Sequence, residues 1–214
     1  MTARLPLQNR VDPYGALTAV SARGTLMGNR GGRIHDAEQR LTRRRWASRR
    51  WICCALAFKG RHRCVWRAGY TELFFLDEVT ALAAGHRPCF ECRRADALRF
   101  QACFARGGDG ALPGADAMDA ALHRERLAGG RQALSVTRLD DLPDGAVIAI
   151  AARPLAVAGG QLLPWSFDGY GAPLPRAGFC AATLLTPACV LAALRAGYRP
   201  QWHASAAQAP LTTP

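Results

Sequence analysis

Two cysteines separated by two residues, Cys89 and Cys92, are the strongest chemical signal in the sequence. On a tight turn such a pair directs both sulfur atoms toward one point, which is the arrangement of a zinc knuckle. Two more cysteines, Cys53 and Cys54, stand together in an upstream stretch that alternates like a β-strand. Because side chains alternate across a strand, only one of this doublet can face the knuckle, and the other should be a packed thiol. We therefore expect a zinc site that draws on both cysteine groups.

The residues before the knuckle predict the elements that position it. Residues 70–75 are aromatic and β-prone, and Asp77 can cap a helix over residues 78–84. Gly85 can take the left-handed conformation that ends a helix, and the Arg-Pro pair that follows cannot continue one, so the chain must turn into the first cysteine. The Arg-rich run after the second cysteine looks helical. The sequence thus predicts a strand, a helix, a knuckle and a second helix, in that order.

This stretch, residues 74–96, resembles the metal-binding domain of the Ada family of alkyl-DNA repair proteins. The shared features are an aromatic pair, a short helix that ends in Ala-Ala-Gly, and Arg-Pro-Cys-x-x-Cys with an Asp soon after. The resemblance implies that Cys54 matches the first upstream cysteine of the family, which accepts a methyl group there. Phe58 stands where the family has its second upstream cysteine. Similar knuckles are appended to some nucleases, so the resemblance implies either methyl transfer or metal-assisted nuclease activity.

The expected zinc ligands are Cys54, Cys89, Cys92 and His35. Cys54 is preferred over Cys53 because the resemblance places it at the site, and Cys53 is the alternative. A closed structural site needs a fourth ligand, for which His35, Cys64 and His62 are available. His35 is preferred because it ends an unusual Gly-dense loop, whereas Cys64 is already explained as an inward residue of a predicted hairpin.

The positive charge of the chain is concentrated in its first third. The formal net charge is +12, and residues 1–70 hold fifteen basic and three acidic side chains, while residues 71–214 hold thirteen of each. A basic run that contains an aromatic residue suits a nucleic-acid backbone and one stacked base. The alternatives are a solvated charged face and an internal interface with acidic residues of the second half. We expect nucleic acid, DNA rather than RNA, as the partner. The predicted contact residues are Arg43, Arg44, Arg45, Trp46, Arg49 and Arg50.

The sequence predicts an α+β protein. Its 214 residues and 50% hydrophobic composition suffice for one domain or two small ones with a real core. The predicted segments are a loop-rich N-terminal stretch (1–33), a zinc-knuckle module with a β-hairpin over residues 51–66 (34–106), a linker (107–115), a small α+β module of antiparallel strands and two helices (116–203) and a flexible tail (204–214). In the second module, short antiparallel strands are predicted over residues 146–150, 154–158 and 161–167.

The composition also limits the location and the function classes. No stretch approaches the ~20 consecutive apolar residues of a membrane span, and the N-terminus lacks an apolar signal core. We therefore expect a cytoplasmic protein with reduced cysteines and no membrane partner. Three classes fit the sequence: a zinc protein that binds nucleic acid, an enzyme of the methyl-transfer or nuclease type, and a protein-interaction module with a structural zinc.

Overall fold

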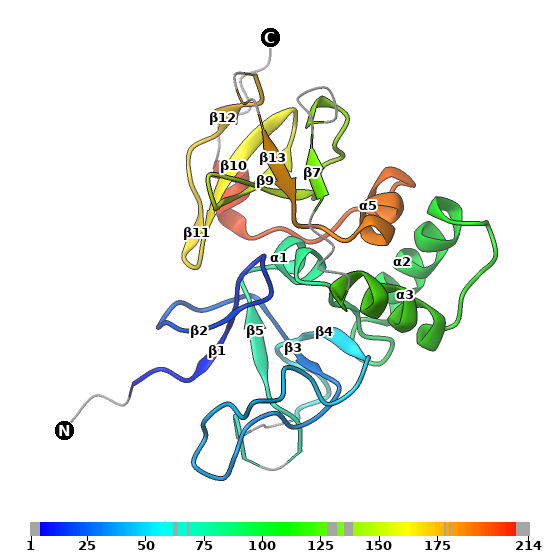
Figure 1. Ribbon diagram of the computed structural model, residues 1–214. Coiled ribbons are helices and arrows are strands. Elements are labelled where there is room, and N and C mark those ends of the chain that lie inside the picture. The colour runs from blue at the N-terminus through cyan, green and yellow to red at the C-terminus, as the bar shows by residue number, and fades with distance from the viewer. Residues whose placement is uncertain are drawn as a thin grey trace.

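The protein has an α+β fold in which two β-sheets lie on either side of a short central helix (Figure 1). The computed structural model describes residues 5–61, 64–67, 69–127, 132–134, 139–177, 179 and 181–208. The central helix is α1 (Glu78–Ala83). Beside the sheets lie three longer helices, α2 (Arg94–Gly107), α3 (Ala115–Leu127) and α5 (Ala188–Arg195). The predicted α+β class is confirmed.

The first sheet is built from the N-terminal part of the chain. Its strands are β1 (Gln8–Val11), β2 (Leu17–Ala19), β3 (Leu26–Arg30), β4 (Trp51–Ala55), β5 (Leu73–Phe75) and β6 (Arg87–Pro88). Their spatial order is β2-β1-β5-β3-β4-β6. Three of these strands fall within residues 1–33, so the prediction that this segment is a loop was wrong.

The Gly-rich run over residues 28–33, which suggested a loop, begins inside a buried strand. All five residues of β3 are buried, and β3 is hydrogen-bonded to β4 on one side and to β5 on the other. A Cβ atom added at Gly28 would lie 2.1 Å from the backbone oxygen of Ile52 on β4. Gly28 therefore serves the close approach of two strands rather than a turn.

The hairpin predicted over residues 51–66 is also corrected. β4 pairs with β3 in antiparallel register and with β6 in parallel register, so that Cys53 lies opposite Gly28 on one side and Pro88 on the other. Residues 64–67 belong to no strand. A strand with two partners satisfies both rows of its backbone hydrogen-bonding groups, whereas an isolated two-stranded hairpin is only marginally stable. β4 therefore pairs with β3 and β6, and the predicted hairpin is not formed.

Helix α1 forms as the sequence predicts and is completely buried. Asp77 caps it, since its Oδ1 accepts the backbone N–H of Thr80 at 2.9 Å, and Gly85 follows the helix with a positive φ of 79°. The faces of the helix contribute to different hydrophobic clusters. Ala81 packs with the first sheet, Val79 with the second sheet and Leu82 with the longer helices. α1 is thus the element on which the other layers converge.

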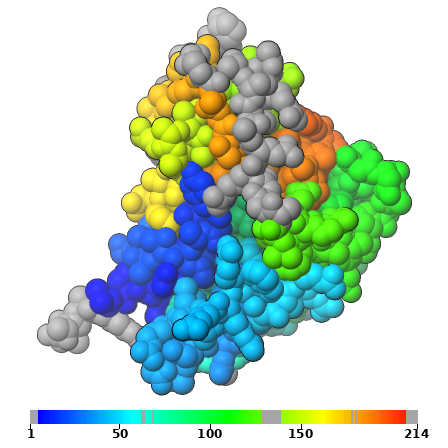
Figure 2. Space-filling model, in the orientation of Figure 1, coloured from blue at the N-terminus to red at the C-terminus, as the bar shows by residue number. Residues whose placement is uncertain are grey.

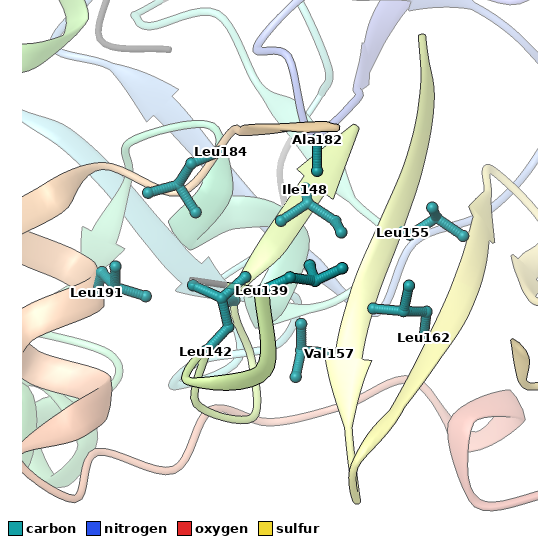
Figure 3. Close-up of a cluster of buried hydrophobic side chains, with 10 residues drawn as sticks. Leu139, Leu142, Ile148, Leu155, Val157, Leu162, Ala182, Leu184 and Leu191 are labelled. Atoms are coloured by element: carbon teal, nitrogen blue, oxygen red, sulfur yellow. The ribbon is translucent and has the colours of Figure 1, made fainter. Parts of the chain in front are cut away.

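The second sheet follows the predicted antiparallel pattern. Its strands are β7 (Gln132–Leu134), β8 (Val147–Ile150), β9 (Arg153–Ala158), β10 (Gln161–Ser166), β11 (Gly169–Tyr170), β12 (Leu174–Pro175) and β13 (Ala182–Leu184), and β8, β9 and β10 pair consecutively in antiparallel register. The side chains on one face of this sheet, among them Leu155 and Leu162, form a core with Leu139 and Leu142, and Leu191 of α5 lies at its edge (Figure 3).

The two predicted modules share their interior. One cluster joins Phe100 of α2 to Met118 of α3 and Val190 of α5, so it contains residues from both sides of residues 107–115. The division into domains at this point remains a prediction. The predicted tail begins with a 3-10 helix, η1 (Ala204–Gln208), whose Ser205 accepts the backbone N–H of Tyr170 at 2.8 Å. This part of the tail is packed and not free, and residues 209–214 lie outside the described residues. Within the described part of the chain, no helix has the length and apolar character needed to cross a membrane.

Candidate metal centre and basic surface

The structure brings three cysteines together, which we call the cysteine cluster: Cys54, Cys89 and Cys92. Their sulfur atoms all lie within 4.8 Å of one another. Cys54 is near the end of β4, and the other two lie in the turn that joins β6 to α2. The parallel pairing of β4 and β6 sets this geometry, because the backbone N–H of Cys89 donates to the carbonyl of Cys53 at 2.9 Å. The cluster therefore combines one strand position with one local turn.

The turn itself has the local geometry of a metal knuckle. The backbone N–H of Glu91 donates to the sulfur of Cys89 at 3.4 Å, and the N–H of Arg93 donates to the carbonyl of Cys89 at 3.1 Å. These hydrogen bonds fix the direction of the Cys89 sulfur before any ion binds. Cys54 and Cys89 are buried, and Cys92 is half-buried. The site is thus pre-formed and close to the surface.

The three sulfurs share their protons. The thiol hydrogen bond from Cys54, and next that from Cys92, lowers the pKa of Cys89 to about 2. Hydrogen bonding to Cys89 and Cys92 raises the pKa of Cys54. The cluster therefore concentrates negative charge on one sulfur. A thiolate attracts a cation, and a soft metal ion would displace the remaining thiol protons.

Cys53 points to the other side of β4, as strand alternation predicts. It is buried with Val11, Leu73 and Phe75 of the first sheet, whereas Cys54 packs with Met27 and Cys89. Burial raises the pKa of Cys53 far above its usual range, so this thiol stays protonated. The doublet supplies one cysteine to the cluster and one to the core.

His35 does not join the cysteine cluster. Its Nδ1 lies 2.7 Å from the hydroxyl of Thr71, and its ring stacks on Trp66 with the ring centroids 5.2 Å apart. These partners come from distant parts of the chain, which the local Gly-rich sequence does not reveal. Cys64 is exposed and outside the cluster, and His62 lies outside the described residues. Among the residues that the structure describes, the cluster therefore has three ligands.

Arg93, directly after the knuckle, ties the turn to α1. Its guanidinium is 2.8 Å from Glu78 and 2.7 Å from Asp96, and its Nη1 lies 3.5 Å from the sulfur of Cys53. Glu78 also accepts the hydroxyl of Tyr198 at 2.6 Å. The sequence showed only an Arg-rich run here, so this buried network was missed. It anchors the cysteine cluster to both halves of the chain.

No family model, curated protein or solved structure matches the chain. The function must therefore be inferred from the chemistry of the sites themselves.

A cavity of about 700 Å³, the metal-side cavity, adjoins the cysteine cluster. Cys89 forms part of its wall, together with Ile52, Tyr70 and Phe90. Arg50, one of the predicted contact arginines, also lines it. Cys54 and Cys92 do not line it. An ion on the cluster could therefore be approached from this cavity past Cys89. The cavity could not be predicted from the sequence, because its walls come from five separate segments.

The predicted contact arginines are on the surface. We call residues 43–50 the basic segment. Its five arginines are all exposed, and Figure 2 shows this part of the chain, in cyan, beside the green atoms of α3. Among the described residues, one of the five forms an ion pair, Arg50 with Asp116 at 3.2 Å. The alternative, in which these arginines are neutralised by the second half of the chain, therefore holds only for Arg50.

The side chain of Trp46 is less exposed than those of the arginines around it. Its half-buried ring packs against Trp51, with centroids 6.3 Å apart, and edge-on against His123 of α3 at 5.3 Å. Part of the ring still reaches solvent. Trp46 therefore fixes the basic segment to α3, and stacking with a base would have to use the part of the ring that remains exposed.

Proposed function

We propose that the protein is a cytoplasmic zinc protein that binds nucleic acid, with zinc held by the cysteine cluster and the nucleic-acid backbone held by the basic segment. The observation that carries the proposal is the convergence of three sulfurs, from a strand and a separate turn, within 4.8 Å of one another. Thiolates select soft or borderline ions, and zinc is the usual occupant of such sites. The unpaired exposed arginines support the nucleic-acid part.

The metal-side cavity favours a second candidate function, metal-assisted cleavage of a nucleic-acid backbone. A zinc ion held by three protein ligands keeps one position for water and can make that water nucleophilic. Cys89 borders the cavity, so a substrate in it would lie beside an ion held by the cluster. This candidate requires the fourth position to remain open, so it depends on whether another residue closes the site.

The metal is tested by elemental analysis of the recombinant protein. We expect one zinc per chain, and none in the double variant Cys89→Ser/Cys92→Ser, which should also unfold at a lower temperature because a structural zinc contributes folding free energy. Cys103→Ser is the matched control, since Cys103 is buried among the longer helices and away from the cluster. Unchanged zinc content in the double variant would reject the site.

Alkylation with and without zinc, read by mass spectrometry, tests the ligand set. Zinc should protect Cys54, Cys89 and Cys92, while Cys53 should react only after unfolding. The exposed Cys64 should react equally in both states. Protection of Cys64 by zinc would instead identify it as the fourth ligand, close the coordination sphere and remove the nuclease candidate.

The nucleic-acid part is tested by the salt dependence of binding to single- and double-stranded DNA and RNA. Each arginine that neutralises a phosphate releases counterions, so the logarithm of the affinity should fall with a slope of about 0.7–0.9 per contact. Changing the five arginines of the basic segment to Ser should flatten this slope for all sequences alike. If the wild-type protein shows no salt-dependent binding at micromolar concentration, the nucleic-acid part is wrong while the zinc site stands.

A further inference from the structure

A second unusual group lies at the start of β4, around Trp51. Two guanidinium groups lie over its indole ring: that of Arg30 at 4.0 Å from the ring centroid and that of Arg126 at 4.2 Å. Trp51 and Arg30 are buried, with 5% and 3% of their surface exposed. His86, which has no exposed surface, packs against the same indole with ring centroids 4.9 Å apart. Two cations, Arg30 buried and Arg126 half-buried, thus lie against the same indole ring.

These cations are held by backbone carbonyls and not by carboxylates. Arg30 donates to the carbonyl of Gly15 at 2.6 Å, and Arg126 donates to that of Arg49 at 3.0 Å. Neither arginine takes part in any ion pair between described residues. The Nε atoms of both, and the indole N–H of Trp51, are buried without a hydrogen-bond partner. Buried charges are normally paired, so this arrangement lacks an anion.

A cavity of about 340 Å³, the arginine cavity, opens beside this group. Trp51 and Arg126 form part of its wall, and Arg45 of the basic segment, which is exposed, also lines it. The acidic residue in the wall is Glu125, whose two carboxylate oxygens accept the backbone N–H of Cys189 at 3.1 and 3.3 Å. The wall of the cavity therefore carries two arginines against one glutamate, and the buried Arg30 lies behind Trp51.

Burial is the main cause of a lowered pKa in both Arg30 and Arg126. Burial, and next the charges of Arg126 and Arg45, lower the pKa of Arg30 to about 9, and Asp12 opposes this shift. Burial lowers the pKa of Arg126 to about 10, an effect that Asp119 opposes. Stacking on an indole returns less free energy than the removal of a guanidinium charge from water costs. The stack alone therefore does not balance the burial of Arg30 and the partial burial of Arg126.

We propose that the arginine cavity binds a phosphate group. Guanidinium groups match the oxygens of phosphate in geometry and charge, and three of them suit a dianion better than a single carboxylate. Arg45 at the entrance and Arg126 in the wall would donate to the phosphate oxygens, while the charge of Arg30 acts from behind Trp51. This site is separate from the cysteine cluster, because the two cavities have no lining residue in common.

Thermal unfolding of the zinc-loaded protein in inorganic phosphate, compared with chloride at the same ionic strength, tests this proposal. Phosphate should raise the unfolding temperature in a saturable manner, because a ligand that binds only the folded state stabilises it. Arg45→Gln should weaken phosphate binding about tenfold or more, since a charge-assisted hydrogen bond is lost. Arg44→Gln is the matched control, because Arg44 is equally exposed but does not line the cavity. Equal effects of phosphate and chloride, or equal losses in the two variants, would overturn the proposal.

Oligonucleotides then distinguish the source of the phosphate. Tighter binding of a 5′-phosphorylated oligonucleotide than of its 5′-hydroxyl counterpart, lost in Arg45→Gln, identifies a terminal phosphate. Equal binding of the two, with competition by inorganic phosphate, identifies a phosphate of the backbone. Binding of inorganic phosphate by a protein that binds neither oligonucleotide supports this cavity as a site for a free phosphate compound, and it ends the nucleic-acid part of the proposed function.

Discussion

Two groups of arginines in this protein differ in the chemical groups that contact their guanidinium groups. Arg93, which directly follows Cys92, contacts the carboxylates of Glu78 and Asp96. Arg30 and Arg126, around Trp51, contact backbone carbonyls and an aromatic ring. Burial alone would lower the pKa of Arg93, but the carboxylates of Glu78 and Asp96 help to raise it above its usual value. The pKa of Arg30 and that of Arg126 are instead lowered.

This difference distinguishes Arg93, which stabilises the fold, from Arg30 and Arg126, which belong to the proposed phosphate site. A buried cation with carboxylate partners is already satisfied, so removing a partner damages the fold. A buried cation without such partners gains stability only when an anion arrives. The comparison predicts opposite responses to mutation in the two groups.

The largest effect is expected for Glu78→Ala. Glu78 accepts hydrogen bonds from Arg93, from the hydroxyl of Tyr198 and from the backbone N–H of Gln201, and it is 1% exposed. Its loss leaves a buried arginine partly unpaired and should lower the free energy of unfolding by about 3–5 kcal/mol, measured by urea denaturation. Glu38→Ala, which removes an exposed partner of Arg40, is the control and should leave the denaturation midpoint unchanged. Similar midpoints for both variants would show that the Arg93 group is not essential to the fold.

A somewhat smaller effect is expected at a second paired arginine, Arg87. It forms two hydrogen bonds with Asp119, of 2.9 and 2.8 Å, and both side chains are buried. Asp119→Ala alone should destabilise the protein by about 3 kcal/mol, because the guanidinium is left without its carboxylate. The double variant Asp119→Leu/Arg87→Met should recover most of this loss, since a buried ion pair can be replaced by apolar groups at little cost. A double variant as unstable as the single one would contradict this account.

The smallest effect is expected for Arg30→Met, measured in chloride buffer. The methionine keeps an apolar stem against Trp51 and removes an unpaired buried charge, so the free energy of unfolding should change by less than about 1 kcal/mol. Arg93→Met in the same buffer should be clearly less stable than the wild type. If Arg30→Met is instead the more damaging of the two, Arg30 is a structural residue and the contrast between the groups disappears.

Features that depend on neighbouring residues could be predicted from the sequence. The cap at Asp77 and the helix end at Gly85 each follow from the conformational preference of one residue in its local context. The strands over residues 147–166 follow from short alternating runs and tight turns. The opposite directions of Cys53 and Cys54 follow from strand geometry, which predicts that only one of them faces the knuckle, whereas the choice of Cys54 rested on the resemblance to the Ada family.

Features that depend on distant pairing could not be predicted. β3 contains Gly28 and Asn29, which are poor strand formers, and it is a strand because β4 and β5 lie on both sides of it. The same reason explains why His35 was expected at the metal: its actual partners, Thr71 and Trp66, are brought to it by tertiary folding. The arginine cavity could not be predicted either, because Arg30, Trp51 and Arg126 come from three distant elements, β3, β4 and α3.

The burial of α1 has a consequence for how the chain folds during synthesis. The carboxylates of Asp77 and Glu78 are satisfied by Tyr170, Tyr198 and the backbone of residues 201–203. Before these residues are synthesised, the carboxylates of Asp77 and Glu78 have Thr80 and Arg93 as partners but lack their remaining hydrogen bonds, and the face of α1 that packs on the second sheet lacks its cover. The strands of the first sheet also pair over long sequence separations, which slows folding. The region around α1 therefore remains incompletely folded until residues 198–203 have emerged, and its apolar surface is open to aggregation in that interval.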